Sequence, residues 1–239
     1  MNDRERDDTQ TGRFLNRREV IAYLGAAAGA AVLNPANSSS ASMLPACIGR
    51  PEQTEGPYFI DEKLNRSDIR SDPSDGSVKE GTLLKITFHV LRVTPQGCTP
   101  FQGAIVDVWH CDAAGIYSGV RDNNFITVGK KFLRGCQQTD GNGDARFLTI
   151  YPGWYSGRAV HLHFKIRSAA KGEFTSQLYF DDSLSDQVFS QEPYSKRARR
   201  LMRNENDSLF RSGGKDLLLS PLKEENGYSA VFEIGLPLS

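Results

Sequence analysis

Hydrophobic and polar residues alternate along several short stretches of the chain. Between residues 83 and 91 every second position is apolar, at Leu84, Ile86, Phe88 and Val90. This period of two is typical of a strand with one buried face. Residues 160–166 alternate in the same way, and residues 104–109 are apolar at nearly every position, as expected of a central strand. Further strands are predicted over residues 145–150, 176–180 and 228–234, and just before Asp140.

Turn-forming residues separate these strands. Residues 140–143 read Asp-Gly-Asn-Gly and residues 152–153 read Pro-Gly, and both are strong turn signals. Residues 51–75 are rich in turn formers and charge, so we expect them to be mostly irregular. We expect loops with a helical turn or two over residues 184–212. Many short strands at this spacing predict an all-β protein with a β-sandwich core, long loops and little helix.

The first forty residues have the pattern of a targeting segment. Residues 1–19 are polar and contain five arginines, and residues 20–33 form an Ala/Gly-rich apolar stretch. That stretch is shorter than the roughly 20 residues needed to span a bilayer, but it fits the core of a signal peptide. The pair Arg17-Arg18 before it predicts export by the twin-arginine route. The alternatives are an uncleaved membrane anchor and a disordered basic tail.

We therefore expect a signal peptide over residues 1–41 and one domain over residues 42–239, which is of ordinary size for a single core. The predicted destination is the periplasm or the exterior of the cell, without stable membrane insertion after processing. Basic and acidic residues are balanced at 29 each. This balance gives no electrostatic reason to expect a nucleic-acid partner.

Four cysteines are available for disulfides, namely Cys47, Cys98, Cys111 and Cys136. An even number in an exported protein indicates disulfide bonding, and the sequence does not choose among the three pairings of four cysteines. Residues 44–47 also resemble a lipoprotein cleavage box, so lipidation at Cys47 stays open.

The sharpest chemical feature is His161-Leu162-His163. Residues two apart on a strand share a face, so both imidazoles point to the side opposite the core-facing Leu162. Two adjacent imidazoles form half of a metal site. The only other histidines are His89, expected at the surface, and His110, expected to make a structural hydrogen bond. A site of three or four histidines is therefore hard to assemble.

Two tyrosines are candidates to complete the site. Tyr155 lies in a turn just before the histidine strand, and Tyr117 follows the apolar strand at residues 104–109. A phenolate is a hard anionic oxygen donor that suits ferric iron, and a nearby trivalent cation depresses the phenol pKa. Tyr151 and Tyr179 are interpreted as packing residues, and Tyr58 as a candidate wall of the pocket.

At this point the chain resembles the intradiol ring-cleavage dioxygenases, the family of catechol and protocatechuate dioxygenases, and especially its exported single-chain members. The resemblance rests on residues 54–58 (Thr-Glu-Gly-Pro-Tyr), residues 106–117, residues 147–163 and residues 176–180 (Ser-Gln-Leu-Tyr-Phe). These blocks occur in the family's order. The chain is shorter than the protocatechuate type between Tyr155 and Arg158, which bears on substrate choice.

The resemblance implies a ferric (Fe³⁺) site with four ligands, namely Tyr117, Tyr155, His161 and His163. It implies that Tyr155 leaves the metal when substrate binds, that Arg158 stabilises negative charge on the substrate, and that Gln177 helps to orient it. The implied reaction cleaves a catechol-type ring between its hydroxylated carbons with dioxygen, without an organic cofactor, and gives a cis,cis-muconate-type diacid.

Two other readings of the sequence remain open. One is a β-sandwich binding module that has kept the fold without the chemistry. The other is a zinc-dependent hydrolase that uses His161 and His163. The sequence leaves the identity of the catechol open, and also the oligomeric state, including a homo-oligomer.

Overall fold

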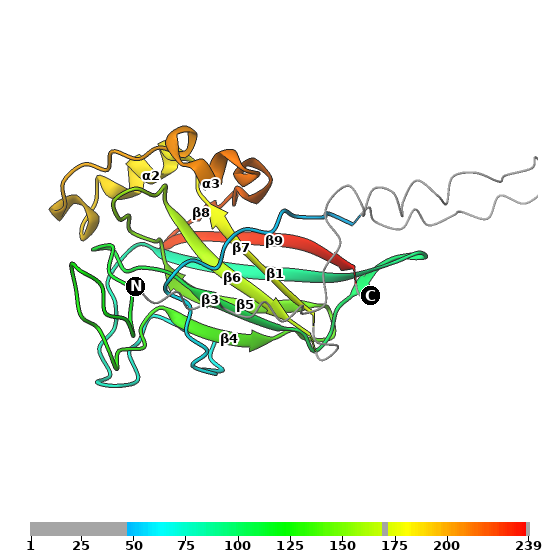
Figure 1. The fold of residues 1–239 in the computed structure, drawn as a ribbon. Helices are drawn as coiled ribbons and strands as arrows, with labels where there is room; N and C mark the ends of the chain where they lie inside the picture. The colour runs from blue at the N-terminus through cyan, green and yellow to red at the C-terminus, as the bar shows by residue number, and fades with distance from the viewer. Residues whose placement is uncertain (1–46, 169–171, 238–239) are drawn as a thin grey trace, which may run out of the picture.

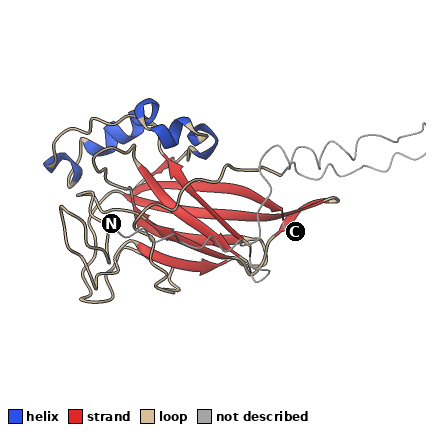
Figure 2. Cartoon of the chain, in the orientation of Figure 1, coloured by secondary structure: helices blue, strands red, loops and turns tan. Residues whose placement is uncertain are grey.

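The computed structural model describes residues 47–168 and 172–237. Two β-sheets form a sandwich, and the helices gather at one end of it (Figure 1, Figure 2). The first sheet has five strands in the order β2-β1-β9-β8, with β5 also paired to β1. Its strands are β1 (Leu83–Thr94), β2 (Gly97–Pro100), β5 (Asp144–Ile150), β8 (Leu222–Glu224) and β9 (Gly227–Pro237).

The second sheet has four strands in the order β4-β3-β6-β7, and its neighbouring strands are all antiparallel. Its strands are β3 (Ile105–Trp109), β4 (Arg134–Gln138), β6 (His161–Arg167) and β7 (Glu173–Tyr179). Two packed sheets with short helices confirm the predicted all-β sandwich.

The core lies between the sheets and is rich in aromatic rings. Phe88 of β1 lies 5.2 Å from Phe164 of β6, and Phe164 lies 5.5 Å from Phe232 of β9, measured between ring centroids. Leu162, Phe164 and Ile166 are all buried on the core side of β6. Because side chains alternate along a strand, His161 and His163 face the other side of the sheet, as predicted.

The segment after β7 supplies the helices. They are α2 (Asp182–Phe189), η2 (Tyr194–Lys196), η3 (Asn204–Asn206), α3 (Ser208–Arg211) and η4 (Gly214–Leu217). Aspartates cap both α-helices: Asp181 accepts hydrogen bonds from the first turn of α2, and Asp207 from that of α3. Since β7 leads directly into α2 and its end pairs with the start of β6, the helices lie at the end of the sandwich where His161 begins β6 (Figure 1).

Four of the observed strands extend the predictions, namely β2, β7, β8 and β9. The short edge strands β2 and β8 were not predicted, because four and three residues are too few to show a clear alternation. Strand β9 is longer than the predicted 228–234, and β7 begins at Glu173 instead of residue 176. The turn at residues 140–143 is confirmed, with the Gly143 amide donating to the Asp140 carbonyl at 2.9 Å.

One disulfide joins Cys47 to Cys98 and fastens the start of the described chain to β2. Cys111 and Cys136 are buried and unpaired, so the even count of cysteines does not produce two disulfides. The predicted signal peptide over residues 1–41 lies outside the described residues. Within the described ranges, none of the helices has the length and apolar character needed to cross a bilayer.

Candidate metal centre

Strand β6 holds the two candidate histidines with little freedom. His161 pairs across the sheet with Tyr179, and His163 lies between Trp109 of β3 and Gln177 of β7. The side chains of His161 and His163 are 2% and 1% exposed. Both imidazoles are therefore held within the protein by their neighbouring strands.

The two candidate tyrosines come from neighbouring loops. Tyr117 follows β3, and Tyr155 lies between β5 and β6. The loops meet closely at Gly153, where an added Cβ would lie 2.3 Å from the backbone oxygen of Asp112. Only glycine permits this approach, which brings the loop of Tyr155 against the loop of Tyr117.

The four rings follow one another in a closed circuit. The centroid of Tyr117 lies 5.7 Å from that of Tyr155 and 6.2 Å from that of His163. Tyr155 lies 5.5 Å from His161, and His161 lies 4.8 Å from His163. The structure thus brings all four predicted ligands together around one point.

Their polar atoms are directed at that point. The Nε2 atom of His161 lies 3.1 Å from Nε2 of His163 and 3.4 Å from the Tyr155 hydroxyl. The Nδ1 atom of His161 lies 2.7 Å from the carbonyl of Ala159, which can only accept, so Nδ1 carries the proton and Nε2 presents a lone pair. The buried Tyr117 hydroxyl has no hydrogen-bond partner among the described residues.

Burial keeps these groups neutral when no cation is near. It lowers the pKa of His161 to about 3, with the positive charge of Arg158 adding to the effect, and it lowers the pKa of His163 well below its usual range. Burial also raises the pKa of Tyr117 and of Tyr155. A bound cation would favour both phenolates and the imidazole lone pairs.

This donor set fits ferric iron. Two phenol oxygens and two imidazole nitrogens are hard and borderline donors. Within residues 47–168 and 172–237, no group of three or more His, Cys, Asp or Glu side chains is placed to hold a metal. A metal at this centre therefore depends on the tyrosine oxygens.

The ring of His163 is fixed by packing. Trp109 stacks on it with centroids 5.0 Å apart and planes 11° apart. Gly56, at φ +72°, also lies against the ring, where an added Cβ would be 3.2 Å from Cε1 of His163. The 54–58 block identified in the sequence therefore packs directly on a candidate ligand. Tyr58 of that block stacks on Tyr117 at 4.5 Å and donates to Asp122 at 2.7 Å, as a wall beside the rings.

Arg158 reaches the centre from a network of partners. Its Nε donates to Asp207 at 2.9 Å, and its Nη2 donates to the amide oxygen of Gln177 at 2.6 Å. Its Nη1 lies 3.5 Å from Nε2 of His161. Burial acts to lower the pKa of Arg158, but the oxygens of Tyr155 and Asp207 outweigh it and raise that pKa. Arg158 is thus a cation with one end aimed at the candidate metal.

Gln177 is fully buried, and both ends of its amide are occupied. Its oxygen accepts from Arg158, and its nitrogen donates to the carbonyl of Thr54 at 2.9 Å. Its contacts therefore hold Arg158 and the 54–58 block in place.

The remaining candidates have structural contacts. His110 makes the predicted structural hydrogen bonds, to the Cys111 carbonyl at 2.8 Å and the Thr149 hydroxyl at 2.7 Å. His89 is partly exposed and pairs with Asp144 at 2.7 Å. Tyr151 and Tyr179 are buried, as predicted for packing residues, but the Tyr179 hydroxyl also contacts Arg158 at 3.3 Å.

Two contributors were missed in the sequence. Asp207 lies in a segment that was expected only to form loops and short helical turns, and no sequence signal connects it to Arg158. Trp109 was assigned to a strand without a further role. Alternation along its strand places Trp109 on the face opposite Val106 and Val108, which is a sequence signal for its side, whereas its pairing with His163 appears only in the structure.

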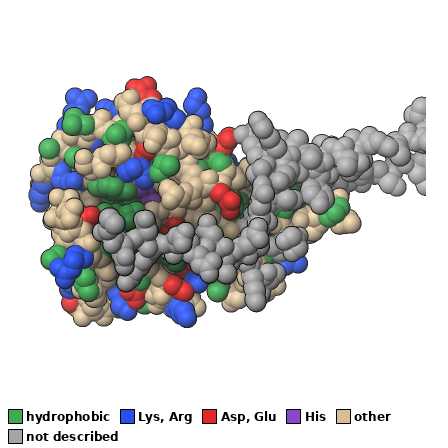
Figure 3. Space-filling view, viewed as in Figure 1, with side chains coloured by type: hydrophobic (Ala, Val, Ile, Leu, Met, Phe, Trp, Pro, Cys, Tyr) green, Lys and Arg blue, Asp and Glu red, His purple; other side chains and the backbone are tan. Residues whose placement is uncertain are grey.

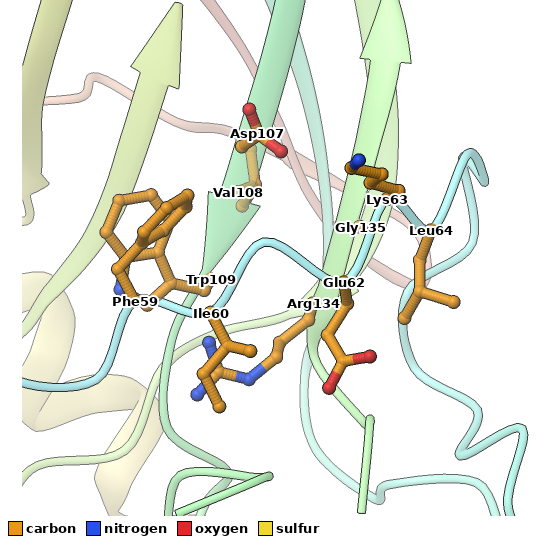
Figure 4. A pocket seen from close by; sticks show the side chains of 10 residues that line it. All are labelled: Phe59, Ile60, Glu62, Lys63, Leu64, Asp107, Val108, Trp109, Arg134 and Gly135. Carbon is orange, nitrogen blue, oxygen red and sulfur yellow. The ribbon is translucent and has the colours of Figure 1, made fainter.

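Histidine atoms are visible among hydrophobic side chains on the face shown in Figure 3. A separate cavity behind Trp109, lined also by Phe59, Asp107 and Arg134, has a volume of about 10 Å³ (Figure 4). That volume accommodates roughly one water molecule, so this cavity is too small for an aromatic substrate.

Known proteins similar to this chain in sequence and structure are dioxygenases. The family model described as "Dioxygenase" matches residues 54–210. A solved intradiol ring-cleavage dioxygenase from Tetranychus urticae superposes with a TM-score of 0.69 at 33% identity, covering 80% of this chain and 95% of that one. The chain belongs to the intradiol ring-cleavage dioxygenase family. All four candidate ligands lie inside the span matched to this dioxygenase family.

Curated relatives in the intradiol dioxygenase family include two bacterial proteins. The protocatechuate 3,4-dioxygenase beta chain of Burkholderia cepacia is 33% identical over 145 residues, which cover 55% of this chain and 62% of that protein. The chlorocatechol 1,2-dioxygenase of Pseudomonas putida is 27% identical over 150 residues, which cover 53% of this chain and 52% of that protein. The chain spans little more than half the length of these curated relatives.

Proposed function

We propose that this chain is a non-haem ferric dioxygenase that cleaves a catechol-type ring between its two hydroxylated carbons. The co-substrate is dioxygen, and the product is a cis,cis-muconate-type diacid. The observation that carries the proposal is the closed circuit of two phenols and two imidazoles, with the Arg158 guanidinium directed at it.

In this proposal ferric iron would be held by the hydroxyl oxygens of Tyr117 and Tyr155 and by Nε2 of His161 and His163. When bound, ferric iron supplies the Lewis acidity that draws electron density from a catecholate and makes its ring reactive toward dioxygen. The hydrogen bond from Nδ1 of His161 to Ala159 keeps the ring in the tautomer that can bind metal.

Tyr155 accepts a proton from the substrate. A catechol that binds through both oxygens loses two protons: the Tyr155 phenolate accepts one, and the other passes to solvent water. Of the two tyrosines, Tyr155 is the half-buried one and lies near the cationic Arg158, whereas Tyr117 is 1% exposed. Tyr117 is therefore the tyrosine that is held in place, and Tyr155 is the one that would take up the proton of the substrate.

Arg158 stabilises negative charge that develops on the substrate. Its Nη1 is the part of the guanidinium that faces the centre, and burial strengthens its interaction with an oxyanion. Gln177 keeps Arg158 in that orientation through the bond to Nη2.

Oxygen uptake with a panel of catechols tests this function. The iron-loaded protein should consume dioxygen with at least one of catechol, hydroxyquinol, protocatechuate or a chlorinated or larger substituted catechol. The Tyr117→Phe variant, which lacks one proposed ligand, is the matched negative control. A colourless protein that carries zinc after expression with ample iron would instead favour a hydrolase, and a metal-free protein would favour a binding module.

We also propose that the protein is exported and acts in the periplasm or outside the cell. The Cys47–Cys98 disulfide supports this location, because disulfides persist in oxidising compartments. The same sulfur of Cys47 cannot carry both this disulfide and a lipid. Changing Arg17 and Arg18 to lysine should retain active, iron-loaded protein in the cytoplasm, whereas normal export of that variant would contradict the twin-arginine route.

A further inference from the structure

Asp207 joins the C-terminal helical segment to the candidate metal centre. Its side chain is buried, and its Oδ1 caps α3 by accepting from the backbone nitrogens of Leu209 at 2.8 Å and Phe210 at 3.3 Å. Its Oδ2 accepts from Nε of Arg158 at 2.9 Å and from the backbone nitrogen of Ala159 at 2.8 Å. A helix cap needs only the first pair of bonds, so the second pair indicates an additional role.

The bond to Arg158 decides how its guanidinium is oriented. Arginine has five N–H groups in a planar fork. Asp207 accepts from Nε, while Nη2 donates to Gln177 at 2.6 Å and to the Tyr179 hydroxyl at 3.3 Å. Only the Nη1 group then remains to face the centre, 3.5 Å from Nε2 of His161. Without the Asp207 carboxylate, the Arg158 guanidinium loses the acceptor that fixes its Nε.

The bond to Ala159 connects Asp207 to a candidate ligand. The Ala159 amide donates to Asp207, and the Ala159 carbonyl accepts from Nδ1 of His161 at 2.7 Å. The two groups flank a single residue, so Asp207 holds the backbone whose carbonyl orients the imidazole. Hydrogen-bond partners behind a metal-binding histidine govern both its tautomer and its orientation.

We propose that Asp207 is a positioning residue for the reaction, which aligns Arg158 toward the substrate and fixes the backbone behind His161. The proposal rests on the proposed function for its catalytic part. The carboxylate acts through these two residues and touches neither substrate nor metal.

The test compares Asp207→Asn with a matched cap variant. Asparagine still caps a helix, but its amide nitrogen presents hydrogens where Arg158 and Ala159 need an acceptor. Asp181 caps α2 in the same way, through Ser183 and Leu184, and none of its side-chain hydrogen bonds reaches the centre. Asp181→Asn therefore controls for the loss of a capping carboxylate.

We expect Asp207→Asn to lower kcat by about 10²-fold, at the lower end of the loss expected for Arg158→Ala, and to weaken iron binding by roughly 10- to 100-fold. Asp181→Asn should change neither. With iron saturating, so that the effect on iron binding through His161 is removed, the double variant Arg158→Ala/Asp207→Asn should be no slower than Arg158→Ala alone, because both substitutions remove the same alignment of the guanidinium. Rate losses that multiply, or an unchanged kcat in Asp207→Asn, would overturn the proposal.

Melting temperatures separate this inference from the proposed function. Arg158→Ala leaves the Asp207 carboxylate buried without its cation, so adding Asp207→Asn should restore part of the lost melting temperature. If no catechol is turned over, the proposed function fails. The positioning role is still tested, because it requires the restored melting temperature of the double variant and weaker iron binding in Asp207→Asn. If Asp207→Asn alone does not fold, the double variant supplies both measurements. The positioning role would be contradicted if the melting-temperature losses of the two single variants simply added in the double variant and if Asp207→Asn bound iron as tightly as the wild type.

Discussion

The Nε2 atoms of His161 and His163 lie 3.1 Å apart, on the face of β6 that points away from the core. The proton on Nδ1 of His161 leaves Nε2 with a lone pair, and its contacts with the Tyr155 hydroxyl and Nη1 of Arg158 are long, at 3.4 Å and 3.5 Å. A cation between these nitrogens and the two tyrosine oxygens would satisfy all four groups. This relationship leads to the first prediction.

The purified protein should contain about one iron per chain and be red to brown, because phenolate bound to ferric iron absorbs visible light. Tyr117→Phe removes a proposed ligand whose hydroxyl has no hydrogen-bond partner among the described residues, so the iron and this band should be lost together while the protein stays folded. Visible absorption and metal analysis measure the effect. Tyr151→Phe, which changes a buried tyrosine bonded to Ser185, is the control and should keep the colour.

Arg158→Ala should retain iron and colour while kcat falls by about 10²- to 10³-fold, the usual effect of removing a group that stabilises developing charge. Steady-state kinetics should place the loss mainly in kcat. Arg146→Ala removes an exposed arginine that pairs with Asp140 and Asp144, and it should leave turnover unchanged. Equal turnover rates for Arg158→Ala and the wild type would show that Arg158 serves only in a structural ion pair.

Stability of the iron-free protein should fall with acid through His110. Burial lowers the pKa of His110 to about 4, so between pH 6.5 and 4 the unfolded chain binds a proton that the folded chain does not. The free energy of unfolding therefore decreases as the pH falls through this window, by at most roughly 3 kcal/mol from this residue. Urea unfolding at several pH values should show a shallower dependence for His110→Gln. Equal slopes would contradict a neutral, buried His110.

Removing the disulfide should destabilise the protein. Cys47 and Cys98 close a loop with a sequence separation of 51 residues, and closing such a loop typically stabilises a protein by about 2–4 kcal/mol. A reductant should lower the unfolding free energy of the wild type and leave that of Cys47→Ser/Cys98→Ser unchanged. A double variant as stable as the oxidised wild type would show that the bond does not form.

The sequence predicts the β-sandwich and the face of β6 that carries the two histidines, because both follow from the alternation of apolar and polar residues along single strands. Leu162 and Phe164 identify the core side of β6, and the opposite face of His161 and His163 follows directly. Tyr117 and Tyr155 are candidates from their donor chemistry and position, but their assignment as ligands requires the family resemblance, since loop positions have no such period. Their meeting depends on the close approach at Gly153, which only the folded chain defines.

Long-range contacts were outside the reach of the sequence. Asp207 looks like an ordinary helix cap, and its bond to Arg158 spans 49 residues. The Cys47–Cys98 pairing depends in the same way on where β2 lies beside the N-terminal segment, because all three pairings of four cysteines are equally compatible with the sequence.

The central claim is intradiol cleavage by dioxygen, and isotope labelling tests it most directly. The iron-loaded protein is incubated with its best catechol under ¹⁸O₂, and the product is analysed by mass spectrometry and NMR. The account predicts a cis,cis-muconate-type diacid that carries both atoms of one dioxygen molecule. A semialdehyde from cleavage beside the hydroxyl pair, or a product without label from dioxygen, would contradict it.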